Sequence, residues 1–381
     1  MIRIWGIFMI SERDKRLLLL VMGGILIAVI GFFVIEPIFD MRVSWPPPEQ
    51  VRFIKQQDGQ FELLWASSPV YSGARTSGEN IYLTSIGENA YIIASFDENR
   101  TSLYKLDIPT GQVYWHILQK RSVLPREPIN LASNSQYIFV GLDAIGRVDH
   151  EDMRAASRVV TYDPASGQEI WSQPIGGAKS VDSLIVTESI VSVIGFSYYY
   201  VLDAESGVVL EKISRAEEEP RGFVLFMDEN ISYEFKFRSI QAVDRRTGRK
   251  LWVQQAHCCI YEPPVITDKL LIVHTNPATG RVQAFDRLTG ELVWQYDTND
   301  VVSNLAMGDN SIVYFVTEEA HLLAVDAHTG QELGRVEFGP GRAGDQSTVY
   351  AYDVTASQDF VLVYMGDGQK LFAFRFLGGD E

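Results

Sequence analysis

A five-residue pattern, Asp-x-x-Ser/Thr-Gly, occurs six times along this chain of 381 residues. Successive glycines of the pattern lie 56, 40, 41, 42 and 40 residues apart. A period of about 40 residues is typical of folds that repeat one supersecondary unit, and it constrains the fold more than composition does. The six copies are Asp107 to Gly111, Asp163 to Gly167, Asp203 to Gly207, Asp244 to Gly248, Asp286 to Gly290 and Asp326 to Gly330.

Each copy lies between two short runs in which apolar and polar residues alternate, such as Ile-Gln-Ala-Val at 240–243. A period of two is typical of half-buried β-strands. The aspartate can cap the turn amides, and the glycine can adopt the positive φ that closes a hairpin. A tryptophan follows the glycine by four residues in four copies, whereas Glu211 and Gly334 occupy this position in the other two. The four tryptophans are Trp115, Trp171, Trp252 and Trp294.

A further apolar run and a more variable segment precede each hairpin, which gives four strands per repeat. Four strands in about 40 residues are typical of a β-propeller blade, and we interpret the tryptophan as a spacer packed between neighbouring blades. The sequence therefore predicts an all-β fold, a β-propeller of four-stranded blades. We interpret the 56-residue interval as an insertion of about sixteen residues within 142–157 of the second blade.

The number of blades depends on the two ends of the repeat array. Six complete hairpins give six blades, and a seventh begins at 348–355, continues through 360–364 and 371–374, and lacks an outer strand. The segment 59–65 resembles the strand that follows each turn, although its Trp65 is displaced by two residues. If this segment completes the last blade, the ring closes and no seam is left open. We therefore predict seven blades, with six or eight as the alternatives.

The N-terminus carries a separate signal. Residues 17–35 are uncharged and mainly apolar, and as a helix they can cross a hydrocarbon core of ~30 Å. The residues before them include Arg13, Lys15 and Arg16, so the positive-inside rule places the tail inside and the rest of the chain outside. A cleaved signal peptide is the alternative, but no small-x-small cleavage site follows the apolar core.

These features divide the chain into a cytoplasmic tail at 1–16, a transmembrane helix at 17–35, a proline-rich linker at 36–58 and a propeller at 59–377. Within the linker, Trp45 and the three prolines after it are expected to form a stiff spacer. We expect a single-pass protein of a bacterial cytoplasmic membrane with an extracytoplasmic propeller. The chain has 33 Lys and Arg against 49 Asp and Glu and no basic stripe, which argues against nucleic-acid binding.

The run 283–294, Gln-Ala-Phe-Asp-Arg-Leu-Thr-Gly-Glu-Leu-Val-Trp, resembles the repeat of the quinoprotein, or pyrroloquinoline-quinone-like, propellers. The resemblance covers nearly everything from residue 60 to 376 and implies the propeller fold. That superfamily includes dehydrogenases that hold the quinone and a calcium ion in a central funnel. It also includes non-catalytic propellers, notably the β-barrel assembly lipoprotein of outer membranes, a docking scaffold. This chain departs from that lipoprotein because it lacks a lipid-attachment cysteine and has seven predicted blades rather than eight.

The sharpest candidate for a binding site is His257-Cys258-Cys259, in a loop expected to cross the propeller face between the fourth and fifth blades. In the large quinoprotein alcohol dehydrogenases, adjacent cysteines form a vicinal disulfide over the quinone. There the pair lies early in a longer chain, and the calcium-binding and catalytic residues of those enzymes cannot be placed here. A structural disulfide and two free thiols are the alternatives. We expect no catalytic residue and no metal, since these three side chains cannot comfortably share one tetrahedral centre.

We expect a non-catalytic scaffold that requires no cofactor, is anchored in the membrane through 17–35 and presents its propeller face to a protein partner. The acidic run Glu217 to Glu219 is expected on the same face as the cysteines, either as solvated charge or as part of a partner surface. Two alternative functions remain. One is a quinone-dependent dehydrogenase with pyrroloquinoline quinone (PQQ) and calcium, and the other is a propeller that binds a small ligand or a polysaccharide.

Overall fold

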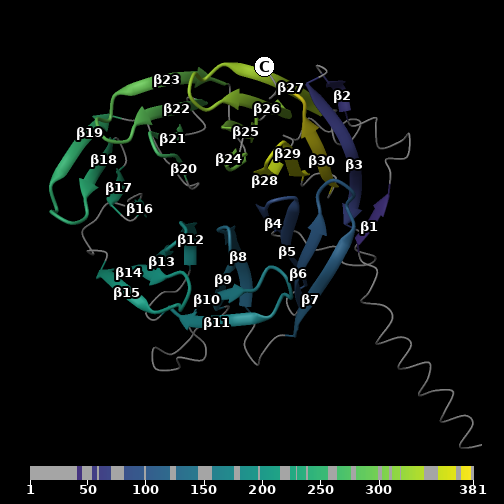
Figure 1. Ribbon diagram of the computed structural model, residues 1–381, viewed down its shortest axis with the longest axis horizontal. Helices are drawn as coiled ribbons and strands as arrows, with labels where there is room; N and C mark the ends of the chain where they lie inside the picture. Colours follow the sequence, from purple (N-terminus) through teal and green to yellow (C-terminus); the bar gives the residue numbers. More distant parts are fainter. Residues whose placement is uncertain are drawn as a thin grey trace, which may run out of the picture.

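The computed structural model shows seven antiparallel sheets arranged as blades around a central axis (Figure 1). Within the described residues every regular element is a β-strand, and none is a helix long and apolar enough to span a membrane. The predicted transmembrane helix at 17–35 and the tail at 1–16 lie outside the described residues. The structure describes residues 41–44, 54–57, 60–69, 81–97, 100–120, 126–144, 157–175, 181–195, 198–214, 224–228, 230–236, 239–255, 264–275, 280–298, 303–308, 311–317, 319–338, 351–365 and 370–378.

Blades 1 to 3 each contain four strands that run in chain order from the centre of the ring outwards (Figure 1). Blade 1 consists of β4 (Ile81–Ile86), β5 (Asn89–Asp97), β6 (Arg100–Asp107) and β7 (Val113–Lys120). Blade 2 consists of β8 (Arg126–Ser133), β9 (Ile138–Ala144), β10 (Arg158–Tyr162) and β11 (Glu169–Pro174). Blade 3 consists of β12 (Val181–Val186), β13 (Ile190–Gly195), β14 (Tyr198–Asp203) and β15 (Val209–Ser214).

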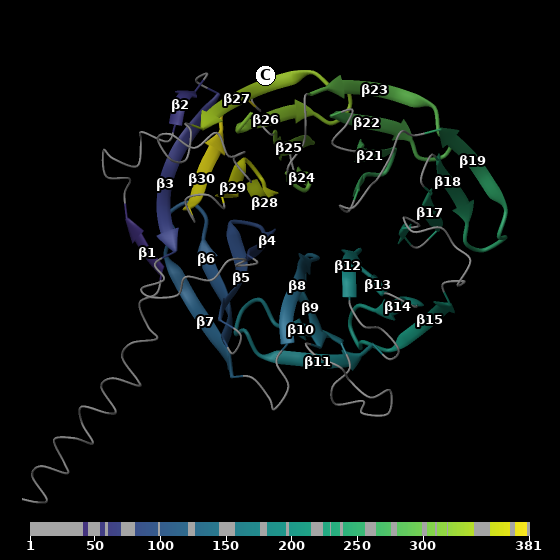
Figure 2. The same cartoon turned by 180° about the vertical axis from the view of Figure 1, so that it is seen from behind.

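Blades 4 to 6 follow the same order around the ring, as the reverse view also shows (Figure 2). Blade 4 consists of β16 (Val224–Met227), β17 (Ile231–Lys236), β18 (Ser239–Asp244) and β19 (Lys250–Gln255). Blade 5 consists of β20 (Val265–Ile266), β21 (Leu270–Thr275), β22 (Arg281–Asp286) and β23 (Leu292–Asp297). Blade 6 consists of β24 (Ala306–Met307), β25 (Ile312–Val316), β26 (His321–Asp326) and β27 (Glu332–Phe338).

Blade 7 joins the two ends of the chain and closes the ring. Its inner strands are β28 (Ala351–Ser357), β29 (Phe360–Met365) and β30 (Lys370–Phe376), and its fourth strand is the N-terminal β3 (Phe61–Pro69). Trp65 lies opposite Ala373, just as Trp252 lies opposite Ala242 and Trp294 opposite Ala284. The two-residue displacement of Trp65 in the sequence therefore disappears in the structure. The predicted seven four-stranded blades are confirmed.

Two short strands extend the sheets of blades 6 and 7 beyond the predicted four strands. β1 (Met41–Ser44) pairs with β3, and β2 (Ile54–Gln57) pairs with β27. Both lie in the segment 36–58 that the sequence predicts to be a linker. They add to the outer edges of two blades because strand edges present unpaired backbone N–H and C=O groups, a pairing that a single-strand pattern does not reveal.

The hydrophobic core lies between the blades. Each cluster of buried side chains combines residues from neighbouring sheets: Ile272 and Trp294 of blade 5, for example, share a cluster with Phe315 and Leu323 of blade 6. The alternation of side chains along each strand lets the inner three strands contact both neighbouring blades. The insertion predicted in blade 2 falls between β9 and β10, and its residues 145–156 lie outside the described part.

Candidate functional site

The six Asp-x-x-Ser/Thr-Gly segments form the turns between the third and fourth strands of blades 1 to 6. In blade 1, the Asp107 carboxylate accepts a hydrogen bond of 2.9 Å from the Thr110 backbone N–H, and the Gly111 N–H donates to the Asp107 carbonyl at 2.7 Å. Gly111 has a φ of 69°, and the other five turn glycines have φ values between 67° and 75°. Glycine is favoured there because it adopts this left-handed conformation without a Cβ clash. The residue that follows the aspartate also donates a backbone hydrogen bond to the turn between strands one and two in five blades, as Arg245 does to Asn230 in blade 4 (2.9 Å).

These turns explain why the aspartates recur. Hydrogen bonds from Ser206 lower the pKa of Asp203 below its ordinary value, and hydrogen bonds from Thr247 do the same to the pKa of Asp244. The carboxylates are anionic caps on separate blades, so they do not form pairs for acid–base chemistry. We call the face that carries these turns and the turns between strands one and two the turn face.

The tryptophans fasten each blade to the turn of the next. Trp252 donates from its indole nitrogen to the Arg287 carbonyl at 2.9 Å, and Trp294 donates to the Ala327 carbonyl at 2.8 Å. Trp65 and Trp171 make the equivalent bonds, to the carbonyls of Ile108 and Ala204, and Trp115 donates one residue further along its turn, to the carbonyl of Ala165. The indole also covers the turn glycine of the next blade at four junctions, where a Cβ added to Gly167, Gly207, Gly290 or Gly330 would lie 2.5 to 3.1 Å from a tryptophan atom.

Two junctions lack the tryptophan and are built differently. At the junction of blades 6 and 7, a Cβ added to Gly334 would lie 3.0 Å from both Gln60 and Phe376, so the closing strand and the C-terminal strand fill the space. At the junction of blades 3 and 4, Glu211 occupies the tryptophan position and forms an ion pair of 2.9 Å with Arg245. These two positions looked like simple omissions in the sequence, but the structure shows packing by Gln60 and Phe376 at one of them and an ion pair at the other.

The ion pair of Glu211 and Arg245 continues into a polar belt that crosses blades 3, 4 and 5 on the turn face. Arg245 donates to the Asp228 carbonyl at 2.7 Å. The Asp228 carboxylate caps the backbone N–H groups of Asn230 and Ile231, both at 2.8 Å, and forms an ion pair with Arg287. We define the polar belt as Glu211, Arg245, Asp228 and Arg287.

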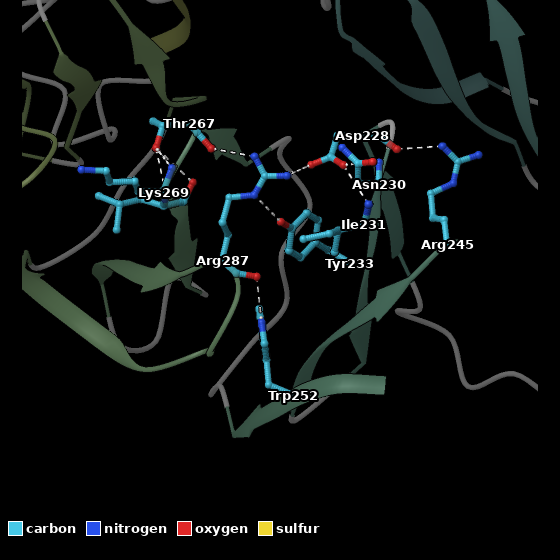
Figure 3. A network of polar contacts seen from close by, with 10 residues as sticks. Asp228, Asn230, Ile231, Tyr233, Arg245, Trp252, Thr267, Lys269 and Arg287 are labelled. Carbon is cyan, nitrogen blue, oxygen red and sulfur yellow. Dashed lines mark hydrogen bonds and ion pairs between the residues drawn. The ribbon is translucent and has the colours of Figure 1, made fainter. Parts of the chain in front are cut away.

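Arg287 is the residue that ties this belt to blade 5. Its guanidinium donates to the Tyr233 hydroxyl at 3.1 Å and to the Thr267 carbonyl at 2.9 Å, besides its bond to Asp228 (Figure 3). The side chains of Arg287 and Asp228 are only 15% and 6% exposed, and burial raises the pKa of Tyr233 to about 12. The Asp228–Arg287 pair therefore holds charge in a fixed, largely dry arrangement, which suits it to rigidity rather than to proton transfer at neutral pH.

Sequence reasoning missed this belt. The signal was an arginine directly after the turn aspartate, which occurs in blades 4 and 5 (Arg245 and Arg287) but not in the other four copies. In those copies the same position holds Ile108, Pro164, Ala204 or Ala327. An arginine at this point reaches the neighbouring blade, but only the folded ring shows that Asp228 lies within its reach.

The inner strands are also joined across the blades, around the point where the ring closes. The Asp353 carboxylate of blade 7 accepts hydrogen bonds from the backbone N–H groups of Leu83 in blade 1 (2.5 Å) and Val354 (2.9 Å). The Ser85 hydroxyl lies 2.8 Å from that of Thr355. These bonds give the buried carboxylate a structural use at the centre of the ring.

The cysteine pair and its neighbours fall in parts of the chain that the structure does not describe. β19 ends at Gln255 and β20 begins at Val265, so His257, Cys258 and Cys259 lie outside the described residues. The acidic run Glu217 to Glu219 lies outside them too. Within the described part, no three His, Cys, Asp or Glu side chains gather as metal ligands would. A role for the cysteines stays a prediction.

Comparison with known proteins gives two relatives of different kinds. The chain is 30% identical over 125 residues to the dehydrogenase subunit of a quinone alcohol dehydrogenase of Acetobacter aceti, a match covering 29% of this chain and 16% of the relative. It is 20% identical over 333 residues to the tetrathionate hydrolase of Acidithiobacillus ferrooxidans, a match covering 76% of this chain and 63% of the relative. The matches thus span less than two thirds of either relative. Among solved structures, BamB of Moraxella catarrhalis is similar with a TM-score of 0.46 and 14% identity, over 78% of this chain and 82% of that one.

The ring of blades and its repeated turns define a PQQ-like β-propeller, as the resemblance of the repeats implied. Residues 63–254 and 235–356 match the family described as outer membrane protein assembly factor BamB, which is more than half of the chain. The chain belongs to this family. A BamB-like propeller fits a scaffold or protein-binding module, and a quinoprotein dehydrogenase is also among its relatives.

Proposed function

We propose that this protein is a non-catalytic scaffold that displays its propeller outside a bacterial cytoplasmic membrane and binds a protein partner. The observation that carries the proposal is the family match over residues 63–254 and 235–356, since the family is named for the assembly of other proteins. The rigid construction of the ring supports it. Indole hydrogen bonds fasten five junctions, and the polar belt crosses two. Pre-organised surfaces bind with a smaller loss of conformational entropy.

The proposed anchor is the apolar span at 17–35, with the basic residues before it on the cytoplasmic side. β1, the first described strand, begins at Met41 and pairs with the propeller itself. The span would therefore hold the ring close to the membrane. Protease added to intact spheroplasts is expected to degrade the propeller, whereas protection of the residues after Arg42 would contradict the proposed orientation.

The binding function is tested by crosslinking in intact cells, followed by purification of the full-length chain and mass spectrometry. We expect one protein in near-stoichiometric yield. The family description names outer membrane protein assembly, so a component of such an assembly is the first class of partner to examine. Recovery of the chain alone, at crosslinker levels that capture a known membrane complex in the same cells, would contradict the proposal. The scaffold function requires no cofactor.

A second candidate function is quinone-dependent dehydrogenation. The similarity of 125 residues to a quinone alcohol dehydrogenase favours it, as do the adjacent Cys258 and Cys259. Under this alternative, PQQ and calcium would bind at the centre of the ring. A PQQ titration followed by absorbance separates the two functions. Calcium-dependent, saturable binding would favour the enzyme.

A further inference from the structure

The junction of blades 3 and 4 has an uncovered glycine at its turn. A Cβ built on Gly248 meets no atom of the described residues within 4 Å. The equivalent Cβ on Gly207 or Gly290 would lie 2.6 or 2.5 Å from a tryptophan indole. Gly248 has the same backbone conformation as its counterparts, with a φ of 67°. Among the residues that the structure describes, none therefore fills the space beside Gly248 that an indole occupies at the neighbouring junctions.

Within the described part of the chain, the same junction also has a hydrogen-bond acceptor to which no donor bonds. The indoles of Trp171 and Trp252 donate to the carbonyls of Ala204 and Arg287, the residues directly after the turn aspartates of blades 3 and 5. In blade 4 the corresponding carbonyl is that of Arg245, and no donor among the described residues bonds to it. The open space and the carbonyl together match what an indole contacts elsewhere in this molecule.

The strand that flanks this space presents apolar side chains to solvent. Val209 and Leu210 of β15 are 37% and 58% exposed, and Val208 directly before the strand is 56% exposed; no residue of β15 is buried. Exposed apolar residues also occur on β23, at Leu292 and Val293. There, however, the turn glycine of the following blade is already covered by Trp294. The exposed apolar residues and the uncovered glycine coincide at the junction of blades 3 and 4.

The outer edge of β15 is free to pair, as far as the described residues show. The outer edges of β27 and β3 are paired with β2 and β1. These two added strands show that blade edges of this ring accept an extended segment, and β2 comes from a part of the chain distant from its partner β27. β3, which fills the fourth-strand place of blade 7, shows that a strand brought in from the other end of the chain can place an indole on the turn of the next blade, because Trp65 bonds to Ile108.

We propose that an extended, apolar segment of the partner protein lies along β15 and inserts a tryptophan side chain beside Gly248. The indole N–H donates to the Arg245 carbonyl, and Val208 to Leu210 pack against the flanking residues of the segment. This proposal rests on the proposed protein-binding function and specifies where the partner binds. It identifies the partner by the chemistry of an aromatic side chain, the residue type that most often dominates protein interfaces.

The Glu211–Arg245 ion pair does not fill this space. The two side chains are 45% and 21% exposed, and exposed ion pairs of this kind contribute little to stability. The pair can therefore rearrange to admit an indole at little cost. Arg245 can also stack on an aromatic ring, which adds a cation–π contact.

Three variants test the proposal. Glu211→Trp fills the space with the residue that the other junctions carry, so it is expected to fold and to block the site. Leu210→Glu places a charge on the flanking apolar surface. Val293→Glu is the matched control, because Val293 is the equivalent position of blade 5 and is 49% exposed. Circular dichroism melts of the full-length chain verify that all three variants fold.

The probe is a library of phage-displayed random peptides, selected on the full-length protein. We expect enrichment of peptides with one tryptophan among alternating apolar residues, with binding weakened about tenfold or more by Glu211→Trp and Leu210→Glu but unchanged by Val293→Glu. Failure to enrich such peptides, or equal binding to all variants, would overturn the proposal. The crosslinked cellular partner separates this proposal from the broader one. A partner captured equally by Glu211→Trp overturns the site but leaves the scaffold function standing, whereas capture of no partner contradicts the scaffold function itself.

Discussion

The indole nitrogen of Trp65 donates a hydrogen bond of 2.6 Å to the backbone carbonyl of Ile108. Trp65 belongs to the strand that completes blade 7, and Ile108 follows the turn aspartate of blade 1. This one bond therefore fastens the last blade of the ring to the first. It repeats, at the seam of the ring, the contact that joins blades within the continuous chain.

Replacing Trp65 with alanine should destabilise the protein strongly. The side chain is 2% exposed, and its loss leaves a cavity at the seam besides removing a hydrogen bond. We expect the free energy of unfolding to fall by about 3–5 kcal/mol. Urea unfolding of the full-length chain in detergent measures it, with Leu292→Ala as control, since this half-exposed side chain should change stability by no more than about 0.5 kcal/mol. Equal urea midpoints for Trp65→Ala and Leu292→Ala would contradict the role of Trp65 in closing the ring.

The polar belt gives a second prediction. Asp228→Ala leaves Arg287 with a buried, unpaired charge and should cost about 3–5 kcal/mol of unfolding free energy. The control is Asp297→Ala, which breaks an ion pair with Arg281 in which the side chains are 70% and 41% exposed. That change should cost less than about 1 kcal/mol. Similar losses of unfolding free energy in both variants would show that the buried Asp228–Arg287 pair stabilises the protein no more than an exposed ion pair does.

The turn glycines should respond unequally to substitution. Gly330→Ala adds a Cβ 2.7 Å from Trp294 at a φ of 73°, so it meets both backbone strain and a steric clash. Gly248→Ala meets the backbone strain alone, roughly 1–2 kcal/mol, because the space beside it is open. Thermal unfolding of the two variants is expected to place Gly330→Ala clearly below Gly248→Ala. The reverse order would mean that the junction of blades 3 and 4 is tightly packed.

Because His274 is buried, we expect the protein to lose stability in mild acid. This residue of β21 is buried, and burial lowers its pKa to about 4. As the pH falls from about 6.5 towards 4, the unfolded chain binds a proton at this histidine that the folded chain does not, so folding weakens. The effect should reach about 2–3 kcal/mol between pH 7 and pH 4.5.

Comparison with His274→Leu isolates this effect from the turn aspartates. Hydrogen bonds lower the pKa of several of them, and their contribution is lost at still lower pH. The variant should lose less stability than the wild type over the same interval. If the unfolding free energies of the wild type and His274→Leu change in parallel with pH, a buried histidine that stays neutral in the folded protein is ruled out.

The blade architecture could be predicted because its information is local. Each turn is specified within five residues by an aspartate and a glycine, and the spacing of the copies gives the size of a blade. The seam was also predictable, since the segment around Trp65 carries the pattern of an outer strand even without its turn.

The polar belt and the added strands could not be predicted in the same way. Asp228 and Arg287 are 59 residues apart, and their pairing depends on how neighbouring blades lie in the ring. The pairing of β2 with β27 joins residues as far apart in the sequence as Ile54 and Phe338, through backbone groups that every sequence possesses. Glu211 carried a signal, the absence of a tryptophan, but its meaning required the position of Gly248.

The central claim is that this propeller binds a protein and performs no redox chemistry. It is tested most directly by measuring PQQ- and calcium-dependent dye reduction, with a panel of alcohols, for the full-length chain and for the Cys258→Ser/Cys259→Ser double variant. The scaffold account predicts no reduction above background for either protein and equal capture of the crosslinked partner by both. Dye reduction by the wild type that disappears in the double variant would contradict it.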